Sequence, residues 1–343
     1  MTNDHPANTE RYSRQILFPP IGSKGQERLA LAKAVIVGCG ALGTAQANQL
    51  TRAGVGTLRV IDRDYVEESN LQRQMLFDEA DAAESLPKAV AAEQKLRRIN
   101  SHVQVEGVVA DVDSRNIEGF VAGFGVILDG SDNFETRYLL NDAALKLGIP
   151  WVYGAVVGSY AATLTVVPGR TPCLACLFPD PPQGIYPTCD TAGVIAPAVE
   201  WAASLQVTES LKILLGLESE LHGSLLAADL WKNQFQQVRP QRNPACRACG
   251  ARDFVHLREA ASSTIKLCGR NSVQIHQRQP RQFDLKALQI RLQPFGAVRA
   301  NAYLLKCSLG SYELTVFPDG RAIIRGTQDP AVARGLYAKY LGA

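Results

Sequence analysis

The sequence predicts a doubly wound α/β protein with a Rossmann-like, mostly parallel sheet, an antiparallel extension, a structural zinc site and a small α+β domain at its C-terminal end. Three observations predict this class. Apolar runs of strand length alternate with helical segments up to Pro150. A glycine-rich loop at residues 38–43 follows the first of these runs, and two Cys-x-x-Cys pairs begin at Cys173 and Cys246.

The elements of the first half follow from hydrophobic pattern and turn residues. Ser23 is expected to cap a helix that reaches Lys33, and the apolar run 34–37 is typical of a buried parallel strand. A helix at 42–53 should end at Gly54, which suits a left-handed stop. The other elements expected here are strands at 57–61, 103–109 and 125–128 and helices at 87–99 and 136–147.

The pattern changes after Pro150. The next expected elements are strands at 151–157 and 161–167, a proline-rich loop at 176–187, a long amphipathic helix at 197–215 and a strand at 225–238. A separate unit begins near Arg252. Its expected elements are strands at 264–267, 302–307, 312–317 and 322–325, helices at 285–292 and 331–341, and a segment between 268 and 284 that fits either a strand or a loop.

We therefore expect two domains. Residues 1–251 hold the glycine loop and both cysteine pairs, and residues 252–343 form a small α+β domain whose role the sequence does not indicate. A length of 343 residues suits such a division.

Composition excludes several functional classes. The formal net charge is only +3, and no basic stripe interleaved with aromatic residues occurs, so a nucleic-acid partner is not expected. No run of about 18 apolar residues is present, so no membrane span is expected either. The first ten residues are polar and do not form a secretion signal. The eight cysteines are therefore expected in the reducing cytoplasm, where Cys-x-x-Cys pairs indicate metal binding or redox chemistry.

The glycine loop predicts a nucleotide site. Gly38, Gly40 and Gly43 permit a tight turn and a close approach of the backbone to phosphate at a helix N-terminus. Asp62 follows about 20 residues later, where a carboxylate can hold ribose hydroxyls. The loop and this acid fit NAD(P) as well as ATP, so both nucleotides remain open at this point.

Further charged residues favour a triphosphate. Arg73, Lys88 and Arg14 can supply the extra cations that a departing pyrophosphate needs, and Asp132 offers an oxygen ligand for Mg²⁺. Taken singly, the cations could be solvated surface charges and Asp132 could cap a helix. Their joint occurrence with expected strand ends favours a site, because ligands of open α/β sheets bind at that edge.

The two Cys-x-x-Cys pairs give a complete thiolate set for one zinc ion. Four sulfur ligands, Cys173, Cys176, Cys246 and Cys249, leave no open coordination position, which is typical of a structural metal. Two separate redox pairs are the alternative, although neither pair has a thioredoxin-like context.

These motifs together resemble a known family. The matching stretches are RYSRQ at 11–15, GCGALG at 38–43, DRDYVEESNLQRQ at 62–74, LPK at 86–88, DGSDN at 129–133, TCDTAGVIAP at 188–197 and the cysteine pairs. Over residues 11–250 the chain resembles the bacterial adenylyltransferases related to ubiquitin-activating enzyme (the ThiF, MoeB and HesA family), and it is most similar to the longer thiazole-type members. One departure is Ala41, where many members have glycine; its single methyl group should not prevent nucleotide binding.

The resemblance implies a role for each matched residue. The implied roles are the ribose contact for Asp62, phosphate contacts for Asn70, Arg73 and Lys88, and the magnesium ligand for Asp132. Family members are homodimers, and Arg14 would reach into the partner subunit's site. The matched residues that would complete the nucleotide site are Gly38, Gly40, Ala41, Gly43, Asp64, Ser69, Leu71, Gln72 and Asn133.

The implied reaction is the activation of a ubiquitin-fold sulfur carrier that ends in Gly-Gly. Its C-terminal carboxylate would attack the α-phosphate of ATP, giving an acyl-adenylate and pyrophosphate. The attacking group is already an anion, so alignment and charge neutralisation suffice, and none of the five histidines lies in a motif. Cys189, in the loop before the long helix, could form a covalent link with the carrier, or it could be an inert thiol.

The sequence leaves several alternatives open. A carrier of the thiamine thiazole pathway is the main expectation, with a sulfur donor such as a cysteine desulfurase or a rhodanese as a further partner. A MoaD-type carrier of molybdopterin synthesis is the alternative within the family. An NAD(P)-binding oxidoreductase with a zinc site and a non-catalytic nucleotide-binding scaffold are alternatives of other classes.

Overall fold

The computed structural model describes residues 10–181, 189–258, 264–267, 271–275 and 282–342, without the side chains of 189, 190 and 264–267. The chain divides into two compact units. The first comprises residues 1–189 and 194–259, and the second comprises residues 190–193 and 260–343. Within the described ranges, every helix is too short or too polar to cross a membrane.

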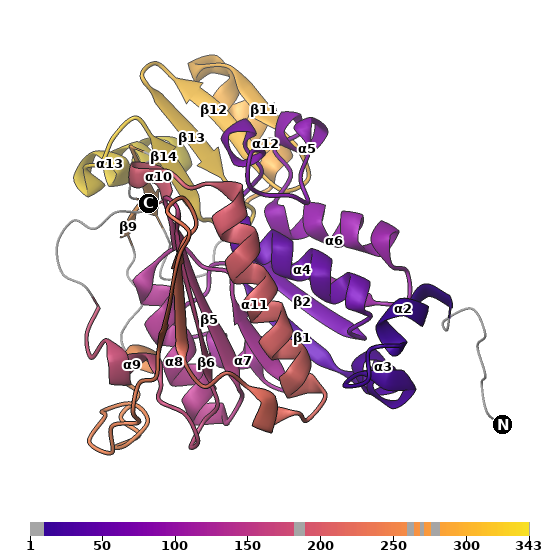
Figure 1. The fold of residues 1–343 in the computed structure, drawn as a ribbon. Helices are drawn as coiled ribbons and strands as arrows, with labels where there is room; N and C mark the ends of the chain where they lie inside the picture. Colours follow the sequence, from indigo (N-terminus) through magenta and orange to yellow (C-terminus); the bar gives the residue numbers. More distant parts are fainter. Residues whose placement is uncertain (1–9, 182–188, 259–263, 268–270, 276–281, 343) are drawn as a thin grey trace. The chain divides into compact units, whose positions relative to one another are not determined.

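The first unit is built on one eight-stranded sheet in the order β3-β2-β1-β4-β5-β6-β7-β8 (Figure 1). The first five of these strands run parallel, and β6, β7 and β8 continue the sheet antiparallel. The strands are β1 (Lys33–Val37), β2 (Thr57–Asp62), β3 (Gln104–Val109), β4 (Val126–Asp129), β5 (Trp151–Val157), β6 (Tyr160–Val166), β7 (Leu225–Asp229) and β8 (Gln234–Val238). The predicted parallel sheet with an antiparallel extension is confirmed.

Helices cover both faces of this sheet (Figure 1). Alternate residues of β1 point to opposite faces. Ala34 and Ile36 pack in one core with α4 (Ala41–Ala53), α6 (Lys88–Ile99) and α11 (Ala196–Leu214). Val35 and Val37 pack in a second core with α7 (Ile117–Val121) and α8 (Phe134–Leu147). Because both of its faces are buried, β1 reads as a continuous apolar run from Ala34 to Val37.

Shorter helices complete the first unit. They are α2 (Ser13–Ile16), α3 (Gly22–Leu31), α5 (Glu79–Ala83) and α9 (Leu174–Leu177), and the 3₁₀ turns η1 (Glu68–Asn70), η2 (Glu218–Glu220) and η3 (Val255–Leu257). Apart from α3, the sequence pattern predicted none of them, because a helix of one or two turns has no measurable hydrophobic period. The prediction that Ser23 caps α3 is wrong: the helix begins one residue earlier, and its N-cap position is Ile21.

Two other predicted boundaries need correction. The expected strand at 225–238 is a hairpin, since β7 and β8 pair antiparallel and Asn233 adopts a positive φ of 54° at the turn. Cys189 was expected in a loop, but it begins the four-residue helix α10 (Cys189–Ala192). Of the expected loop at 176–187, residues 176 and 177 belong instead to α9, residues 178–181 are in neither helix nor strand, and residues 182–187 lie outside the described residues.

The second unit has its own six-stranded antiparallel sheet in the order β11-β12-β13-β14-β10-β9. Its elements are β9 (Thr264–Leu267), β10 (Ser272–Ile275), α12 (Leu285–Leu292), η4 (Gln293–Phe295), β11 (Val298–Ala300), β12 (Leu305–Leu309), β13 (Tyr312–Val316), β14 (Ala322–Arg325) and α13 (Pro330–Leu341). Strand β12 begins later than predicted, because the Asn301 side chain accepts hydrogen bonds from the backbone N–H groups of Tyr303 and Leu304 and fixes a turn there.

Candidate functional site

The glycine loop joins β1 to α4 and requires glycine at two positions. Gly38 has a φ of +96°, and a Cβ added there would lie 2.4 Å from the carbonyl oxygen of Gly130. A Cβ on Gly43 would lie 1.9 Å from the carbonyl oxygen of Gly38. A Cβ on Gly40 would meet only the side-chain amide of Gln74, at 4.0 Å, and Ala41 is the first residue of α4. The loop therefore brings backbone close to the first turn of α4, where N–H groups can bind an anion.

Asp62 ends β2 and faces this loop. One carboxylate oxygen accepts a hydrogen bond from the backbone N–H of Cys39 (2.5 Å), and the other accepts one from that of Asp64 (2.7 Å). Burial raises the pKa of Asp62, and the charge of Lys88 opposes that rise. The carboxylate thus lies beside the glycine loop, and its contact with ribose remains a prediction.

The segment that follows is held by its own polar groups. Asn70 is buried, and its side-chain oxygen accepts the backbone N–H of Glu67 (3.1 Å) in the cap of η1. The Arg73 guanidinium donates to the carbonyl of Ser69 (2.8 Å) and is half-exposed. Leu71 packs on the core, while Ser69 and Gln72 are exposed. Asn70 therefore shapes the segment from which Arg73 projects.

Lys88 is not a solvated surface charge. It is the first residue of α6, its side chain is only 4% exposed, and its Nζ lies 3.4 Å from the Oδ2 of Asp64. The backbone N–H of Lys88 also donates to the carbonyl of Asp64 (2.9 Å). The Lys88 ammonium is therefore a buried cation, held in place by a carboxylate at the carboxyl edge of the sheet.

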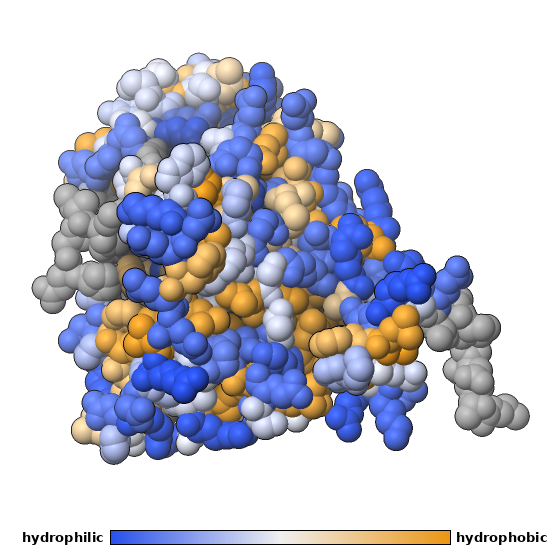
Figure 2. Space-filling model, in the orientation of Figure 1, coloured by the Kyte–Doolittle hydropathy of each residue, from blue (hydrophilic) through white to orange (hydrophobic). Residues whose placement is uncertain are grey.

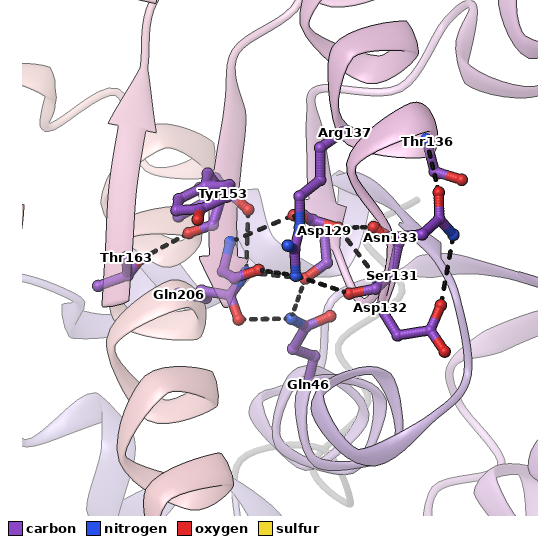
Figure 3. A network of polar contacts seen from close by, with 12 residues as sticks. Gln46, Asp129, Ser131, Asp132, Asn133, Thr136, Arg137, Tyr153, Thr163 and Gln206 are labelled. Carbon is purple, nitrogen blue, oxygen red and sulfur yellow. Dashed lines mark hydrogen bonds and ion pairs between the residues drawn. The ribbon is translucent and has the colours of Figure 1, made fainter. Parts of the chain in front are cut away.

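A network at the end of β4 fixes the neighbouring loop (Figure 3). Asp129 is fully buried, and its Oδ2 lies 3.3 Å from the Nε of Arg137. Arg137 also donates to the carbonyls of Ser131 (3.1 Å) and Gly154 (3.2 Å). The amides of Gln46 and Gln206 each donate to the carbonyl of Asp129 at 2.9 Å. Burial raises the pKa of Asp129, and the Arg137 charge opposes the rise.

Asp132 lies at the outer end of this network and is exposed (Figure 3). The cap of α8 is Asn133, whose side-chain oxygen accepts the N–H of Thr136 (2.8 Å). The amide nitrogen of Asn133 donates to Asp132 (3.3 Å). Because Asn133 serves as the cap, the alternative that Asp132 is the helix cap is wrong. The exposed carboxylate of Asp132 is close in sequence to Gly130, which packs against Gly38 of the glycine loop. A carboxylate oxygen is the kind of ligand that Mg²⁺ prefers.

Arg14 lies far from the glycine loop of its own chain. Its helix, α2, is anchored at the C-terminal end of α4, where Gln15 donates to the carbonyl of Ala53 (2.9 Å) and Tyr12 packs on Gly54. The glycine loop lies at the other end of α4, which has 13 residues and is therefore about 20 Å long. The structure thus brings together the predicted residues from β1, β2, β4 and α6, but not Arg14.

The four cysteines form one cluster. Their sulfur atoms all lie within 4.8 Å of one another, and the described pairs are 3.9 Å (Cys173–Cys176), 3.7 Å (Cys173–Cys246) and 3.4 Å (Cys176–Cys249) apart. Tetrahedral zinc with 2.3 Å bonds would separate its sulfur ligands by about 3.8 Å. The cluster therefore fits a zinc ion, and the alternative of two separate redox pairs is wrong.

The sequence did not identify Arg137, Gln46 or Gln206. Arg137 lies within a helix and is not part of a recognisable motif. The partners of Gln46 lie 83 and 160 residues away along the chain. The side chain of Cys189 lies outside the described atoms, so its predicted covalent role remains a prediction.

A model of the ThiF family matches residues 12–248. The sulfur carrier protein ThiS adenylyltransferase of Bacillus subtilis (strain 168) is 51% identical over 338 residues, covering 97% of this chain and all of that protein. A sulfur carrier protein adenylyltransferase of Thermus thermophilus is 42% identical over 250 residues, covering 70% of this chain and 90% of the relative. The crystal structure of E. coli MccB with ATP shares the fold, with a TM-score of 0.61, 24% identity, and coverage of 70% of this chain and 74% of that one.

Proposed function

Because the chain belongs to the ThiF family, we propose that it is an ATP-dependent adenylyltransferase that activates the C-terminal glycine carboxylate of a ubiquitin-fold sulfur carrier. The observation that carries this proposal is the 51% identity to the ThiS adenylyltransferase of Bacillus subtilis along the whole of that protein. The same relative favours a ThiS-type carrier of thiazole synthesis over the alternative, a MoaD-type carrier of molybdopterin synthesis.

The reaction is a displacement at the α-phosphorus of ATP. A carboxylate oxygen of the carrier forms a bond to this phosphorus, the bond to the β-phosphate oxygen breaks, and pyrophosphate leaves with its electron pair. No proton is moved, so the protein's task is to align the reactants and to neutralise charge. The glycine loop would hold phosphate, Asp62 would hold the ribose, and Arg73 and Lys88 would balance the phosphate charge.

Two metal ions belong to this proposal. Asp132 would hold Mg²⁺, which neutralises charge on the phosphate oxygens when it is bound. The four cysteines would hold a structural zinc ion that joins residues 173–176 to residues 246–249. The donor sets support both: an exposed carboxylate oxygen suits the hard cation, and a cluster of four thiols suits zinc.

We also propose a homodimer in which Arg14 acts in the partner's site. The position of α2 at the far end of α4 supports this, because Arg14 is separated from its own glycine loop by the length of that helix. Figure 2 shows apolar surface gathered over α2 and α3, where Leu17, Phe18 and Leu31 are 70%, 57% and 83% exposed. A second copy that covers this surface would bring Arg14 with it.

The Cys189 thiolate would attack the carbonyl carbon of the carrier's acyl-adenylate, so that a thioester forms and AMP leaves, and a cysteine desulfurase or a rhodanese would supply the sulfur. These two assignments rest on the resemblance and on the place of Cys189 just before α11.

The test is ATP–pyrophosphate exchange with a purified ThiS-type carrier that ends in Gly-Gly. We expect exchange only with the intact carrier terminus and Mg²⁺, and a carrier–AMP adduct by mass spectrometry. Hydride transfer with a bound nicotinamide cofactor would replace this function with an oxidoreductase. Nucleotide binding without exchange, for ThiS-type and MoaD-type carriers alike, would leave a scaffold instead.

A further inference from the structure

Four side chains of alternating charge lie in a row at the carboxyl ends of β2 and β3. Lys88 Nζ is 3.4 Å from Asp64 Oδ2, and Asp64 Oδ1 is 4.0 Å from the Nε of Arg63. Arg63 Nη1 is in turn 2.8 Å from Asp111 Oδ1. We call these four residues the charge relay. Asp64 therefore shares its two oxygen atoms between two cations, the buried ammonium of Lys88 and the guanidinium of Arg63.

We propose that Arg63 is a positioning residue for nucleotide binding, which acts through Asp64 by limiting how firmly that carboxylate holds Lys88. This inference rests on the proposed function, in which Lys88 contacts phosphate. For that contact the ammonium must exchange the attraction of Asp64 for that of the nucleotide. A carboxylate shared with a second cation attracts Lys88 less strongly, so the exchange is easier.

Burial makes this sharing effective. The side chains of Lys88, Asp64, Asp111 and Arg63 are 4%, 18%, 12% and 22% exposed, so solvent screens their charges only in part. Burial alone would lower the pKa of Arg63, but the charges of Asp111, Asp64 and Asp132, in that order, raise it above its ordinary value. The guanidinium therefore keeps its charge among these carboxylates.

The chain offers a matched control four residues earlier, within β2, whereas Arg63 directly follows the end of that strand. Arg59 pairs β2 with an acid of β3, with its Nε 2.9 Å from Glu106, and its side chain is 22% exposed, like that of Arg63. The Arg59–Glu106 pair lies midway along these two strands, and Arg59 is about 13 Å from Arg63 along the chain. Removing its charge should disturb the same two strands without touching Asp64 or Lys88.

The first measurement is the dissociation constant of ATP with Mg²⁺ by isothermal titration calorimetry. Arg63→Gln should weaken ATP binding by about three- to tenfold, while Arg59→Gln should change it less than twofold. Arg63→Lys, which keeps the charge, should restore most of the affinity. In exchange assays Arg63→Gln should raise the KM for ATP and leave kcat within about twofold.

A double-mutant cycle separates positioning from a simple loss of positive charge. In an Asp64→Asn background, Arg63→Gln should change the ATP dissociation constant less than twofold, because the carboxylate that links Arg63 to Lys88 is gone. An undiminished effect in that background would overturn the inference, as would equal effects of the Arg63 and Arg59 variants.

A second variant keeps the test decisive if Arg63→Gln does not fold. Asp111→Asn retains Arg63 but removes the carboxylate that competes with Asp64 for this guanidinium. Arg63 should then attract Asp64 more strongly, and ATP should bind about two- to threefold more tightly. Weaker binding would overturn the inference. Failure of the proposed function looks different: the wild-type protein would then show no carrier-dependent exchange, whatever the Arg63 variants do to ATP affinity.

Discussion

The charge relay and the network around Asp129 lie at the same edge of one sheet, but they differ in burial and in what surrounds their charges. In the network, a fully buried carboxylate pairs with a buried arginine, and neutral amides from Gln46 and Gln206 hold its backbone carbonyl. In the relay, partly exposed carboxylates alternate with cations, and the amide of Asn116 donates to the backbone carbonyl of Asp111 at 2.8 Å. The comparison indicates that the network around Asp129, which we call the frame, is fixed, whereas the charges of the relay can be redistributed when a ligand binds.

The largest expected effect tests the frame. Arg137→Met leaves Asp129 buried without its cation, so we expect the free energy of unfolding to fall by about 3–5 kcal/mol. Arg63→Gln, in the partly solvated relay, should lower it by at most about 1 kcal/mol. Urea unfolding of both variants measures the contrast. Equal losses would show that the two clusters do not differ as their burial suggests.

The next effect concerns the loop that the frame holds. Asp132→Ala should reduce ATP–pyrophosphate exchange by about 100-fold or more, because the proposed magnesium ligand is lost. The side chain is exposed and does not cap α8, so the unfolding free energy should stay within about 0.5 kcal/mol of wild type. Exchange at the wild-type rate would refute the magnesium role. The Arg137 variant provides the opposite case, in which stability changes most.

A smaller change probes one amide of the frame. A Cβ on Gly154 would lie 2.5 Å from the side chain of Gln206, which donates to the carbonyls of Asp129 and Val152 at 2.9 Å. Gly154→Ala should therefore destabilise the protein by about 1–3 kcal/mol. Gly119→Ala is the control, because nothing lies within 4 Å of its Cβ position in α7 and alanine favours a helix. Thermal unfolding should shift in opposite directions for the two variants, and a shift in the same direction would contradict the steric argument.

The smallest expected effect on exchange is that of Cys189. Cys189→Ala should leave exchange within about twofold of wild type, because adenylation uses neither a nucleophilic nor a basic side chain. The same variant should lose any covalent carrier adduct, which intact-mass spectrometry under non-reducing conditions would detect. Loss of exchange would place Cys189 in the adenylation step and end the proposed division between the two steps.

Local signals in the sequence were sufficient for most of the fold. The segment 151–157 was predicted with the bounds of β5, and Gly54 and Gly148 end α4 and α8 in the left-handed conformation. Glycines that end a helix act on the residues next to them, so the local sequence is enough to predict where such a helix ends. The hairpin at 225–238 was missed because its turn lacks an Asn-Gly or Asp-Gly pair, although Asn233 takes the positive φ.

The site was predictable only in part, and the limit is distance along the chain. Asp62 and Lys88 lie at strand or helix ends, so the sheet topology places them at one edge. Arg63 and Asp111 are 48 residues apart, and Gln46 and Gln206 are 160 residues apart. Nothing in the local sequence indicates that such residues meet. Which side chains are neighbours at the edge therefore had to come from the structure.

The length of α4 has a consequence for how activity is shared between chains. One end of this helix faces the glycine loop and the other anchors the segment that carries Arg14. In the proposed dimer, each reaction centre contains residues from both polypeptides. A polypeptide without Arg14 and one without Lys88 would each be inactive as pure pairs, yet a mixed pair would rebuild one working centre out of two. In the proposed dimer, genetic complementation between two defective copies would follow from the length of about 20 Å that separates the two ends of α4.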